Sequence, residues 1–584
     1  MNWKELYALV NENIKNAVSG LYKPAGDVTF AELPELSQSV LGYTYTVTDA
    51  FTTDNRFTDY DTETQTGHSF PADTEVAVIV TGTTENPVYM FNVMGGIMDG
   101  YATKSDLTDY VQKEQGKGLS SNDFTDEEKQ KLDGMIDDSA AGASTTYSSD
   151  KIEQMFIDEK SHFCYSYKID MSDSNPATCV KPHFDTRYGC DNFNFTSAHM
   201  DYANDKFDYG SWEPFIRRIA RPCMLKYDGT VDYYLDPDDY SKRITGEDSD
   251  VADVNYQGNA MVELEKLYFK RYTHNGIQYC FIADRKLDNS FKCYAHHDKY
   301  GKELDYIYRA AYDGSYDGTR LRSISGVDYH NLNALTAGYI MSNTTRQEEM
   351  NFAKANNVST EQGEGWNILH KSEWDYINDI LVLISMSTDT QGTFGRGRDS
   401  GHVSTSDTGI ISTGTMDTKG LFWGKNDGSA GVKVLGIENH WANLFKSCAG
   451  WFNDKGTQKV KYTYGTEDGS TGEGFNTDAS GYINITGATP TKGDSSTSGY
   501  GYITAWQYGE YGTIPYEAIS GASNKYLCDF LYFNNTATCF ALVGGASSDG
   551  LSCGAFCSYL YIGAGYRAWG IGAALSYKGQ SGIN

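Results

Sequence analysis

This 584-residue sequence lacks two features that would place it in large classes of protein: a long apolar run and an excess of basic residues. The longest apolar run, around residues 380–384, is far shorter than the roughly 20 residues that a helix needs to cross a bilayer. The N-terminus begins MNWKELYALV, with no basic segment leading into an apolar core, so the sequence does not predict a signal peptide. We therefore expect neither membrane insertion nor secretion through a signal in this chain.

Basic residues are outnumbered, with 48 Lys and Arg against 78 Asp and Glu and a formal net charge of −30. This charge opposes binding to a phosphate backbone, and no basic aromatic patch compensates for it, so nucleic acid is not an expected partner. Cysteine occurs 11 times, an odd number at irregular spacing, which argues against a disulfide ladder. Synthesis in a reducing cytoplasm, with most thiols free, fits this pattern best.

Proline is also scarce, with 11 residues, whereas the chain has 60 Gly and 45 Tyr. This composition indicates β-rich structure with many loops rather than disorder. The length exceeds what one hydrophobic core supports, so two to four domains are expected. The predicted fold class is mixed α+β and β-rich.

Residues 1–100 are predicted to form an N-terminal module. Apolar residues recur at helical spacing over the first eighteen positions and indicate one amphipathic helix, which Gly20 ends. Short strands separated by polar turns follow, at residues 43–48, 75–81 and 88–93. The module shows no site chemistry, so we interpret it as an attachment piece.

Residues 101–160 are polar, charged and poor in aromatic residues. Thr125 and Glu128 match a capping box that begins one helix, and Ser149 can cap a second. Neither helix is long enough to be stable alone in water, so their apolar stripes need partner chains. A short parallel stalk is the favoured interpretation, and a flexible linker is the alternative.

The chain becomes aromatic and strand-like from residue 161. Two hairpins are predicted, at residues 215–235 with an Asp-Gly turn and at residues 266–283 with an Asn-Gly turn. One helix is clear, with Trp374, Ile377, Leu381 and Ile384 on one side, and short strands and long loops follow it. Residues 161–212 are assigned either to a neck or to an embellishment of the domain at residues 213–584.

The segment from Ala541 to Gly579 is rich in Gly, Ser, Cys, Tyr and Ala. Such a composition does not build a hydrophobic core, and it offers few acid–base groups for catalysis. Small adaptable residues between rigid aromatic rings are typical of a contact surface, because Tyr and Trp supply area at low entropy cost. The segment therefore indicates binding more than chemistry.

Two parts of the sequence resemble proteins of tailed phages. GKGLSSNDFTDEEKQKL and TTYSSDKIEQMF are similar to the stalk repeats of tail-fibre and receptor-binding proteins. The first hundred residues, with VTDAFTTDNRF, FPADTEVAVIVTG and VYMFNVMGG, resemble the N-terminal adaptor module of such proteins. The resemblance implies a homotrimer in the virion tail that a tail or baseplate protein holds by the N-terminal module.

The region from about Phe215 to the end resembles the C-type-lectin-like fold shared by formylglycine-generating enzymes and phage tropism determinants. Four segments carry the resemblance in order: GNAMVELEKLYF, GEGWNILHKSEW, GIENHWANLF and a closing IGAALSY. In that family the second segment begins a core helix, the third closes a buried turn beside it, and the last strand returns to the sheet. One departure is Ala574, where the family usually has Arg.

The C-terminal segment is also similar to the variable region of proteins diversified by phage retroelements, in which fixed residues form a scaffold and interleaved residues contact a host receptor. The positions that match the scaffold are Gly544, Gly545, Gly550, Gly554, Phe556, Gly572, Leu575 and Tyr577. The positions that match the display set, within about residues 544–569, are Ser547, Asp549, Ser552, Cys557, Tyr559, Tyr561, Tyr566 and Arg567.

Several other residues have a functional and a structural interpretation. Trp366, Trp374 and Trp441 can stack on sugars, but the family places them in the core. Glu438 and Asn439 offer calcium ligands, although a buried hydrogen-bonding role is favoured because no further oxygen ligands can be located. The adjacent residues His296 and His297 would face opposite sides of a strand, which argues against a shared metal site.

Cys553 and Cys557 lie where formylglycine-generating enzymes carry a reactive cysteine pair. A thiolate nucleophile needs a lowered pKa, usually from a neighbouring cation, and only Arg567 is near in the sequence. The spacing of the pair also departs from the enzyme pattern. We expect displayed side chains here rather than catalysis.

The sequence and its resemblances together predict a non-catalytic phage receptor-binding protein, with no cofactor and no metal, whose partner is a host cell-surface protein or glycan. The alternative is a tail-spike polysaccharide depolymerase, which needs two carboxylates at a defined separation. None of the 78 acidic residues is singled out as such a pair. A purely structural fibre is disfavoured because the C-terminal sequence is not repetitive.

Overall fold

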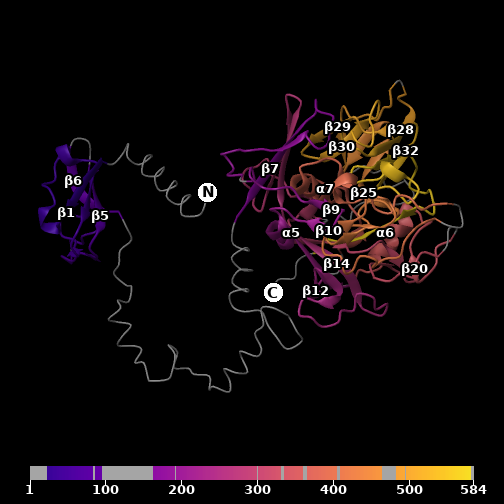
Figure 1. The fold of residues 1–584 in the computed structure, drawn as a ribbon, viewed down its shortest axis with the longest axis horizontal. Coiled ribbons are helices and arrows are strands. Elements are labelled where there is room, and N and C mark those ends of the chain that lie inside the picture. The colour runs from indigo at the N-terminus through magenta and orange to yellow at the C-terminus, as the bar shows by residue number, and fades with distance from the viewer. Residues whose placement is uncertain are drawn as a thin grey trace, which may run out of the picture. The chain divides into compact units, whose positions relative to one another are not determined.

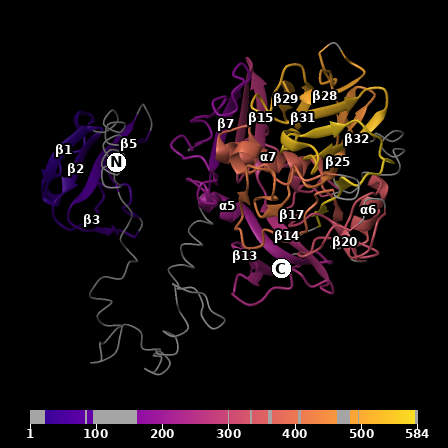
Figure 2. The same cartoon turned by 45° about the vertical axis from the view of Figure 1, so that its right-hand side comes forward.

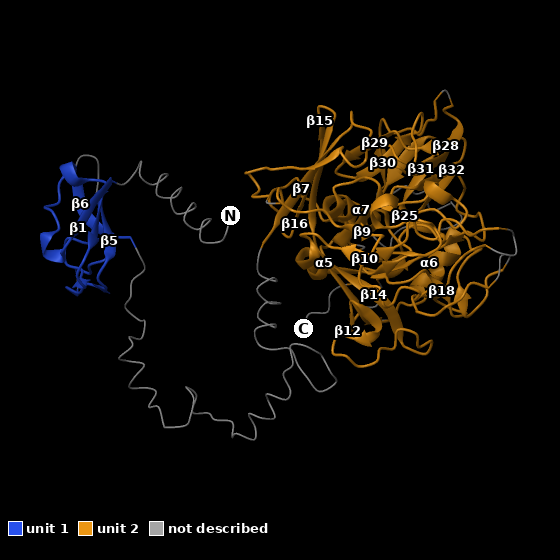
Figure 3. Cartoon of the chain, viewed as in Figure 1, with its two compact units in different colours: residues 1–126 blue, residues 127–584 orange. Residues whose placement is uncertain are grey.

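The computed structural model describes residues 23–62, 64–82, 86–94, 162–190, 192–298, 300–330, 334–358, 365–403, 408–462, 482–493 and 495–579. The chain divides into two compact units, residues 1–126 and residues 127–584 (Figure 3). The helix predicted over the first eighteen residues and the stalk predicted at residues 101–160 lie outside the described residues. Strands outnumber helices in the described part of the chain, so the β-rich fold class is confirmed.

The first unit contains a four-stranded sheet with the order β1-β2-β5-β6. One face of this sheet buries phenylalanine rings, with Phe57 packed 5.2 Å from Phe91 and 5.8 Å from Phe51 between ring centroids. The three strands expected from the sequence are present. The strands of this unit are β1 (Lys23–Val28), β2 (Tyr43–Val47), β3 (Phe51–Thr52), β4 (Ser69–Phe70), β5 (Thr74–Gly82) and β6 (Pro87–Val93).

The larger unit is built on two large sheets. A seven-stranded sheet has the order β13-β12-β11-β14-β17-β35-β21, so the strand nearest the C-terminus lies between two strands from the middle of the chain. Its strands are β11 (Ala220–Lys226), β12 (Val231–Asp236), β13 (Asp239–Arg243), β14 (Gly258–Glu265), β17 (Tyr306–Ala310), β21 (Trp366–Ile368) and β35 (Leu575–Tyr577).

An eight-stranded sheet is formed by the last third of the chain, with the order β27-β26-β25-β32-β33-β31-β28 and β34 paired to β25 (Figures 1 and 2). Its strands are β25 (Phe445–Asp454), β26 (Thr457–Val460), β27 (Ile483–Ile485), β28 (Ser498–Tyr502), β31 (Phe530–Asn534), β32 (Thr538–Val543), β33 (Ser558–Leu560) and β34 (Ile571–Gly572).

Residues 162–212 belong to the same compact unit as the two large sheets. Their first strand, β7 (Cys164–Asp170), pairs along its full length with β16 (Ile277–Ala283), the second strand of the predicted Asn-Gly hairpin. The remaining strands of this four-stranded sheet are β8 (Val180–Pro182) and β15 (Tyr268–His274). This segment is therefore an integral part of the larger unit.

Both predicted hairpins are confirmed, β11–β12 and β15–β16. At the second turn Asn275 and Gly276 have φ values of +51° and +75°, the left-handed pair that a tight two-residue hairpin requires.

Smaller sheets complete the unit: β9 (His199–Asp201) with β10 (Lys206–Asp208); β18 (Ser315–Tyr316), β19 (Leu321–Arg322) and β20 (Tyr339–Ile340); β22 (Trp423–Gly424), β23 (Val432–Val434) and β24 (Ile437–Glu438); and β29 (Ala505–Gly509) with β30 (Gly512–Glu517).

In the part of this unit that the structure describes, the α-helices are α5 (Glu213–Ile219), α6 (Arg346–Lys354), α7 (Lys371–Ser385) and α8 (Thr390–Phe394). The predicted central helix is α7, which begins where the His370 side chain accepts a hydrogen bond from the Ser372 backbone and ends at Met386 with φ +53°. All fifteen of its residues are buried, polar ones included. In both views α7 lies between the eight-stranded sheet and the four-stranded sheet of the larger unit, which consists of β15, β16, β7 and β8 (Figures 1 and 2).

A buried carboxylate on α7 joins three strands of the larger unit. Asp379 accepts hydrogen bonds at Oδ1 from the hydroxyl groups of Tyr167 on β7 and Tyr508 on β29, at 2.8 and 3.0 Å. Its Oδ2 accepts from Arg271 Nε on β15 at 2.5 Å. A buried charge needs such partners, because an unpaired one costs several kcal/mol of desolvation. Asp379 therefore fixes the side of α7 that faces the four-stranded sheet.

Replacing Asp379 by Ala should lower the free energy of unfolding by about 3–5 kcal/mol, because Arg271 would remain buried without its partner. Chemical denaturation followed by tryptophan fluorescence measures this. The matched control is Asp248→Ala, which breaks an exposed pair with Lys242 and should leave the midpoint unchanged. Equal midpoints for the two variants would contradict the assigned role of the buried carboxylate.

A second stability prediction concerns His296, which is completely buried. Its Nε2 lies 3.1 Å from the carbonyl oxygen of Leu264, and its Nδ1 has no hydrogen-bond partner, so a second proton would find no acceptor. Burial lowers the pKa of His296 from 6.5 to about 3. The pKa of His296 is lower in the folded state than in the unfolded state. The contribution of this histidine to the free energy of unfolding is therefore complete above pH 6.5 and is lost as the pH falls toward 3.

The larger unit should therefore lose about 2 kcal/mol of unfolding free energy between pH 7.5 and pH 5 through this histidine alone. The measurement is the difference in pH dependence between the natural chain and His296→Gln, whose amide can still donate to Leu264. A His296→Gln variant with the natural slope would show that this ring does not titrate as described.

Candidate binding surface

The outer face of the eight-stranded sheet carries a continuous row of aromatic side chains. Tyr500 on β28 lies opposite Tyr532 on β31, and Tyr532 lies opposite Tyr559 on β33. Side chains on a strand alternate between faces, so Tyr502 and Phe530 lie on this same face while Leu531 and Phe533 enter the core. We refer to this row as the tyrosine strip, which consists of Tyr500, Tyr502, Phe530, Tyr532, Tyr559 and Tyr561.

The rings of the tyrosine strip contact one another across the strands. Ring centroids are 5.9 Å apart between Tyr500 and Tyr532, 4.8 Å between Tyr532 and Tyr559, and 6.0 Å between Tyr559 and Tyr561. Aromatic pairs at such distances contribute roughly 0.5–1.5 kcal/mol beyond burial. The two ends of the strip are the most accessible, with Tyr500 56% and Tyr561 37% exposed.

A small apolar cluster adjoins the strip on the same face of the sheet, separate from the main core. It contains Phe445, Leu542 and Ile571, and Tyr559 packs against Phe445 with ring centroids 5.2 Å apart. The partly exposed aromatic rings thereby pack against buried side chains that restrict their rotamers. Less side-chain entropy would then be lost when a partner binds. The sheet therefore presents a fixed apolar face with hydroxyl groups on it.

The loop between β32 and β33 is shaped by close backbone approaches. At Gly554 an added Cβ would stand 2.1 Å from Oδ1 of the buried Asp529, whose Oδ2 accepts a hydrogen bond from the Phe556 backbone at 2.7 Å. The residues that match the scaffold set are mostly buried, as a scaffold requires. Gly544, Gly545, Gly554, Phe556, Gly572, Leu575 and Tyr577 are buried, and Gly550 is partly exposed.

Two of the residues expected to be displayed are not at the surface. Ser547 and Cys557 are both 0% exposed, so the expectation of display is wrong for them. Ser547 Oγ donates a hydrogen bond to the carbonyl of Thr408 at 2.5 Å. Cys557 belongs to the apolar cluster that adjoins the strip. Both are held by the tight loop, which turns these small side chains inward.

The other six residues of the display set reach the surface to different degrees. Asp549 and Ser552 are partly exposed, and Asp549 Oδ2 closes its own turn by accepting from the Ala546 backbone at 2.8 Å. Tyr559 is half-buried, Tyr561 is exposed, and Tyr566 is 52% exposed. Arg567 is exposed but already paired, with its Nη2 2.7 Å from Oε1 of Glu348 at the start of α6.

The tyrosine hydroxyl at the centre of the strip is neutral at neutral pH. Burial raises the pKa of Tyr559 to about 12, with Tyr566 and Tyr561 adding to the shift, so its hydroxyl stays protonated. Burial also raises the pKa of Asp549, and the ion pair with Glu348 neutralises Arg567. The rings offer a partner apolar contact and hydroxyl hydrogen bonds, and Lys492, whose Nζ lies 4.7 Å from the Tyr500 ring centroid, adds one cation at the end of the strip.

Four residues of the strip lie outside the sequence-based display set: Tyr500, Tyr502, Phe530 and Tyr532. Their sequence signal is an aromatic residue at alternate positions in SGYGY and FLYFN, which on a strand places both rings on one face. The pairings of β28 with β31, and of β31 in parallel with β33, together bring Tyr500 and Tyr559 onto one face although they are 59 positions apart in the sequence.

The remaining candidates are structural. Trp366, Trp374 and Trp441 are buried as expected, and Trp374 stacks on His440 with ring centroids 4.1 Å apart. Cys553 is buried as completely as Cys557, and burial raises the pKa of both thiols well above the usual value. A thiolate nucleophile is therefore disfavoured at this pair.

Glu438 has the hydrogen-bonding role that was favoured over a calcium site. Its two carboxylate oxygens accept backbone hydrogen bonds from Gly414 at 2.9 Å and Met416 at 2.8 Å. Its neighbour Asn439 donates to Oδ2 of Asp313 at 2.9 Å. Both side chains are buried, so they stabilise the turn beside α7.

A second surface feature is a pocket lined by aromatic and charged residues near α7. Tyr294, Tyr462 and Tyr511 form a stack, with ring centroids 4.5 Å apart for the first pair and 5.4 Å for the second. Two carboxyl groups also line the pocket: Glu510, which accepts from the Tyr294 hydroxyl, and Asp375, which pairs with Lys371. We refer to it as the tyrosine pocket.

No protein-family model matches this sequence, and no curated protein matches it either. None of the helices in the described part of the chain has the length and apolar character needed to span a bilayer. The phage and lectin resemblances therefore stay predictions.

The loop that supports the strip yields a prediction at Gly545. Its φ is +88°, and an added Cβ would stand 2.4 Å from Cys553 Sγ and 3.0 Å from Cys553 Cα. Gly545→Ala should destabilise the larger unit by about 3 kcal/mol or more, from left-handed strain and overpacking together. Gly550→Ala is the control, because Gly550 has φ +58° but open space, and should cost about 1 kcal/mol. Equal losses of unfolding free energy in the two variants would show that the loop rearranges to accommodate a side chain at Gly545.

Proposed function

We propose that this chain is a receptor-binding protein of a phage tail, and that the surface around the tyrosine strip binds a host cell-surface protein or glycan. The observation that carries the proposal is the row of mutually contacting, partly exposed tyrosines on a rigid sheet, continued by Tyr566. Tyrosine is enriched in binding surfaces because it combines a large apolar ring with a hydroxyl group.

The arrangement of the four family-like segments supports the proposed lectin-like head. The first segment contains β14, the second contains β21 and begins α7, and the third contains β24 and places Trp441 in the core. The closing segment forms β35, which returns to the seven-stranded sheet between β17 and β21. This order in space agrees with what the resemblance implies for each segment.

The remaining parts of the proposal rest on the sequence resemblance. The N-terminal module attaches the chain to a tail or baseplate protein, residues 101–160 associate three chains, and the protein resides in the virion tail. Three heads on one fibre would supply avidity, so that a weak single contact suffices for adhesion. In this proposal the chain recognises its receptor and performs no chemistry on it.

The alternative, a polysaccharide depolymerase, is favoured by one observation: the tyrosine pocket combines a ring stack with two carboxyl groups. Glycoside hydrolysis uses a carboxyl pair. The rings, however, stack on one another, and the pocket has room for little more than a water-sized molecule, so a sugar would have to open it. Burial raises the pKa of Asp375, although Lys371 opposes the shift. Both carboxyl groups are already engaged by neighbouring side chains, which favours binding over catalysis in this pocket.

Replacing the three most exposed tyrosines of this surface together, Tyr500→Ala, Tyr561→Ala and Tyr566→Ala, should reduce adsorption of phage particles to sensitive cells at least tenfold. The reason is that truncating an aromatic anchor typically costs more than about 1 kcal/mol of binding. The control replaces two exposed aromatic residues elsewhere in the larger unit, Phe184→Ala and Phe193→Ala. Thermal melting of both variants checks that the fold is retained.

Normal adsorption by the folded triple variant would contradict the assignment of the face. The alternative function is tested separately, by incubating the purified chain with host capsule or cell-wall polysaccharide. Release of soluble oligosaccharide, and its loss in Asp375→Asn, would replace the binding proposal by the depolymerase one.

A further inference from the structure

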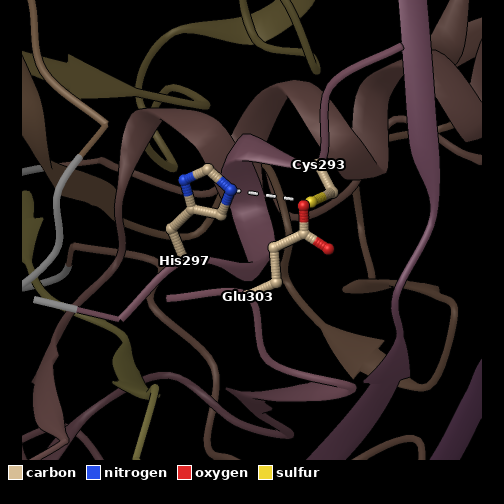
Figure 4. Close-up of side chains that lie close together, drawn as sticks. All are labelled: Cys293, His297 and Glu303. Atoms are coloured by element: carbon tan, nitrogen blue, oxygen red, sulfur yellow. Dashed lines mark hydrogen bonds between the residues drawn. The ribbon is translucent and has the colours of Figure 1, made fainter. Parts of the chain in front are cut away.

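Three side chains with metal-ligand chemistry converge in the segment between β16 and β17. The ligand atoms of Cys293, His297 and Glu303 all lie within 4.8 Å of one another (Figure 4). Cys293 is buried, His297 is partly buried and Glu303 is exposed, so the cluster runs from the core to the surface. It lies outside the tyrosine strip.

Local backbone structure brings the three residues together. A single 3-10 turn (Tyr294–His296) separates Cys293 from His297 and points both side chains to the same side. His297 and Glu303 then pair as an isolated antiparallel bridge, which the hydrogen bond from Leu304 N to the His296 carbonyl at 2.8 Å continues. All three ligands therefore come from eleven consecutive residues.

The turn between the bridged residues is fixed by its own side chain. Asp298 Oδ1 accepts hydrogen bonds from the backbone of Tyr300 and of Lys302, both at 2.8 Å. The sequence-based expectation of a strand at the two histidines is wrong, because they lie at the end of a 3-10 turn. They nevertheless diverge: His296 bonds to a core carbonyl, whereas His297 turns to Cys293.

The spacing of the thiol and the imidazole suits a tetrahedral transition-metal site. Cys293 Sγ and His297 Nε2 are 3.6 Å apart. With zinc–sulfur and zinc–nitrogen bonds of about 2.3 and 2.0–2.1 Å, two ligands of a tetrahedral zinc ion stand about 3.5 Å apart. A thiolate and a carboxylate also supply two negative charges, which a divalent cation balances.

The carboxylate of Glu303 is held in place by a neighbour. The Tyr268 hydroxyl donates to Glu303 Oε2 at 2.5 Å, and such outer hydrogen bonds orient metal ligands. The nearest cation is Lys266, whose Nζ is 3.8 Å from Glu303 but closer to Asp305, at 2.8 Å. The lysine charge is therefore taken up chiefly by Asp305.

We propose that Cys293, His297 and Glu303 bind a divalent cation of the zinc class, with the fourth coordination position open to water on the exposed side of Glu303. A thiolate and an imidazole favour zinc over the hard ions calcium and magnesium. The Tyr294 ring lies edge-on to His297 with centroids 5.7 Å apart and also belongs to the tyrosine pocket. The cation site is thus next to that pocket.

Cobalt(II) tests the site because a thiolate ligand gives it a charge-transfer absorption in the near ultraviolet. The full chain, stripped with a chelator, should bind one cobalt ion with this absorption, and zinc should displace it. His297→Gln and Glu303→Gln should each weaken binding at least tenfold, and Cys293→Ala should abolish the absorption. Tyr268→Phe should weaken binding about tenfold through the outer hydrogen bond.

The exposed His199 gives the matched control, since His199→Gln should bind cobalt as the natural chain does. Glu303→Gln guards against misfolding, because the residue is exposed and its amide oxygen can still accept from Tyr268. Zinc should also raise the melting temperature of the natural chain and not of Glu303→Gln. The proposal is overturned if the natural chain shows no thiolate absorption, or if Glu303→Gln and His297→Gln bind cobalt as tightly as the natural chain.

Discussion

The larger unit depends on how a fully buried helix satisfies its polar groups. Helix α7 has no solvent-facing side, so each charged residue on it must find a partner in the surrounding sheets. Asp379 finds three, on β7, β15 and β29, and Lys371 pairs with Asp375 one turn away. These bonds contribute specificity as much as stability, because the strands must hold one register to reach the helix. The segment at residues 162–212 is fixed to the rest through the same carboxylate.

That rigid centre explains how a glycine-rich C-terminal segment can present a defined surface. The segment contributes β33, β34 and β35 to sheets that earlier strands have built, so its conformation is set by long-range pairing rather than by local propensity. Gly545 and Gly554 allow the backbone to pass close to Cys553 and Asp529, where any side chain would collide. The rings of the tyrosine strip then stand on strands rather than on free loops, and a preorganised surface loses less entropy on binding.

Local patterns in the sequence were sufficient for the hairpins and for α7, because a turn dipeptide and a helical period are properties of adjacent residues. They were insufficient for the binding face. Cys557 and Ser547 were expected at the surface, but the direction of a small side chain in a tight loop depends on the neighbours that tertiary pairing supplies. Tyr500 and Tyr532 were missed because the pairing of β28 with β31 joins distant segments. Likewise, the cluster at Cys293 depends on a 3-10 turn where the sequence suggested a strand.

The net charge of −30 and the near-neutral strip constrain how a receptor would be captured. Electrostatic steering raises association rates only where charges complement each other, and a strongly acidic chain is repelled by an acidic cell surface. Neutral tyrosine rings would add nothing to that repulsion, and they would attract a partner only through short-range contact after a collision. Such contact forms at unsteered rates, so the lifetime of attachment must come from slow dissociation or from several heads acting together. Under the proposed function, the chemistry of the strip and the proposed threefold assembly therefore support the same mode of adhesion, in which each contact would be weak and their number would hold the particle.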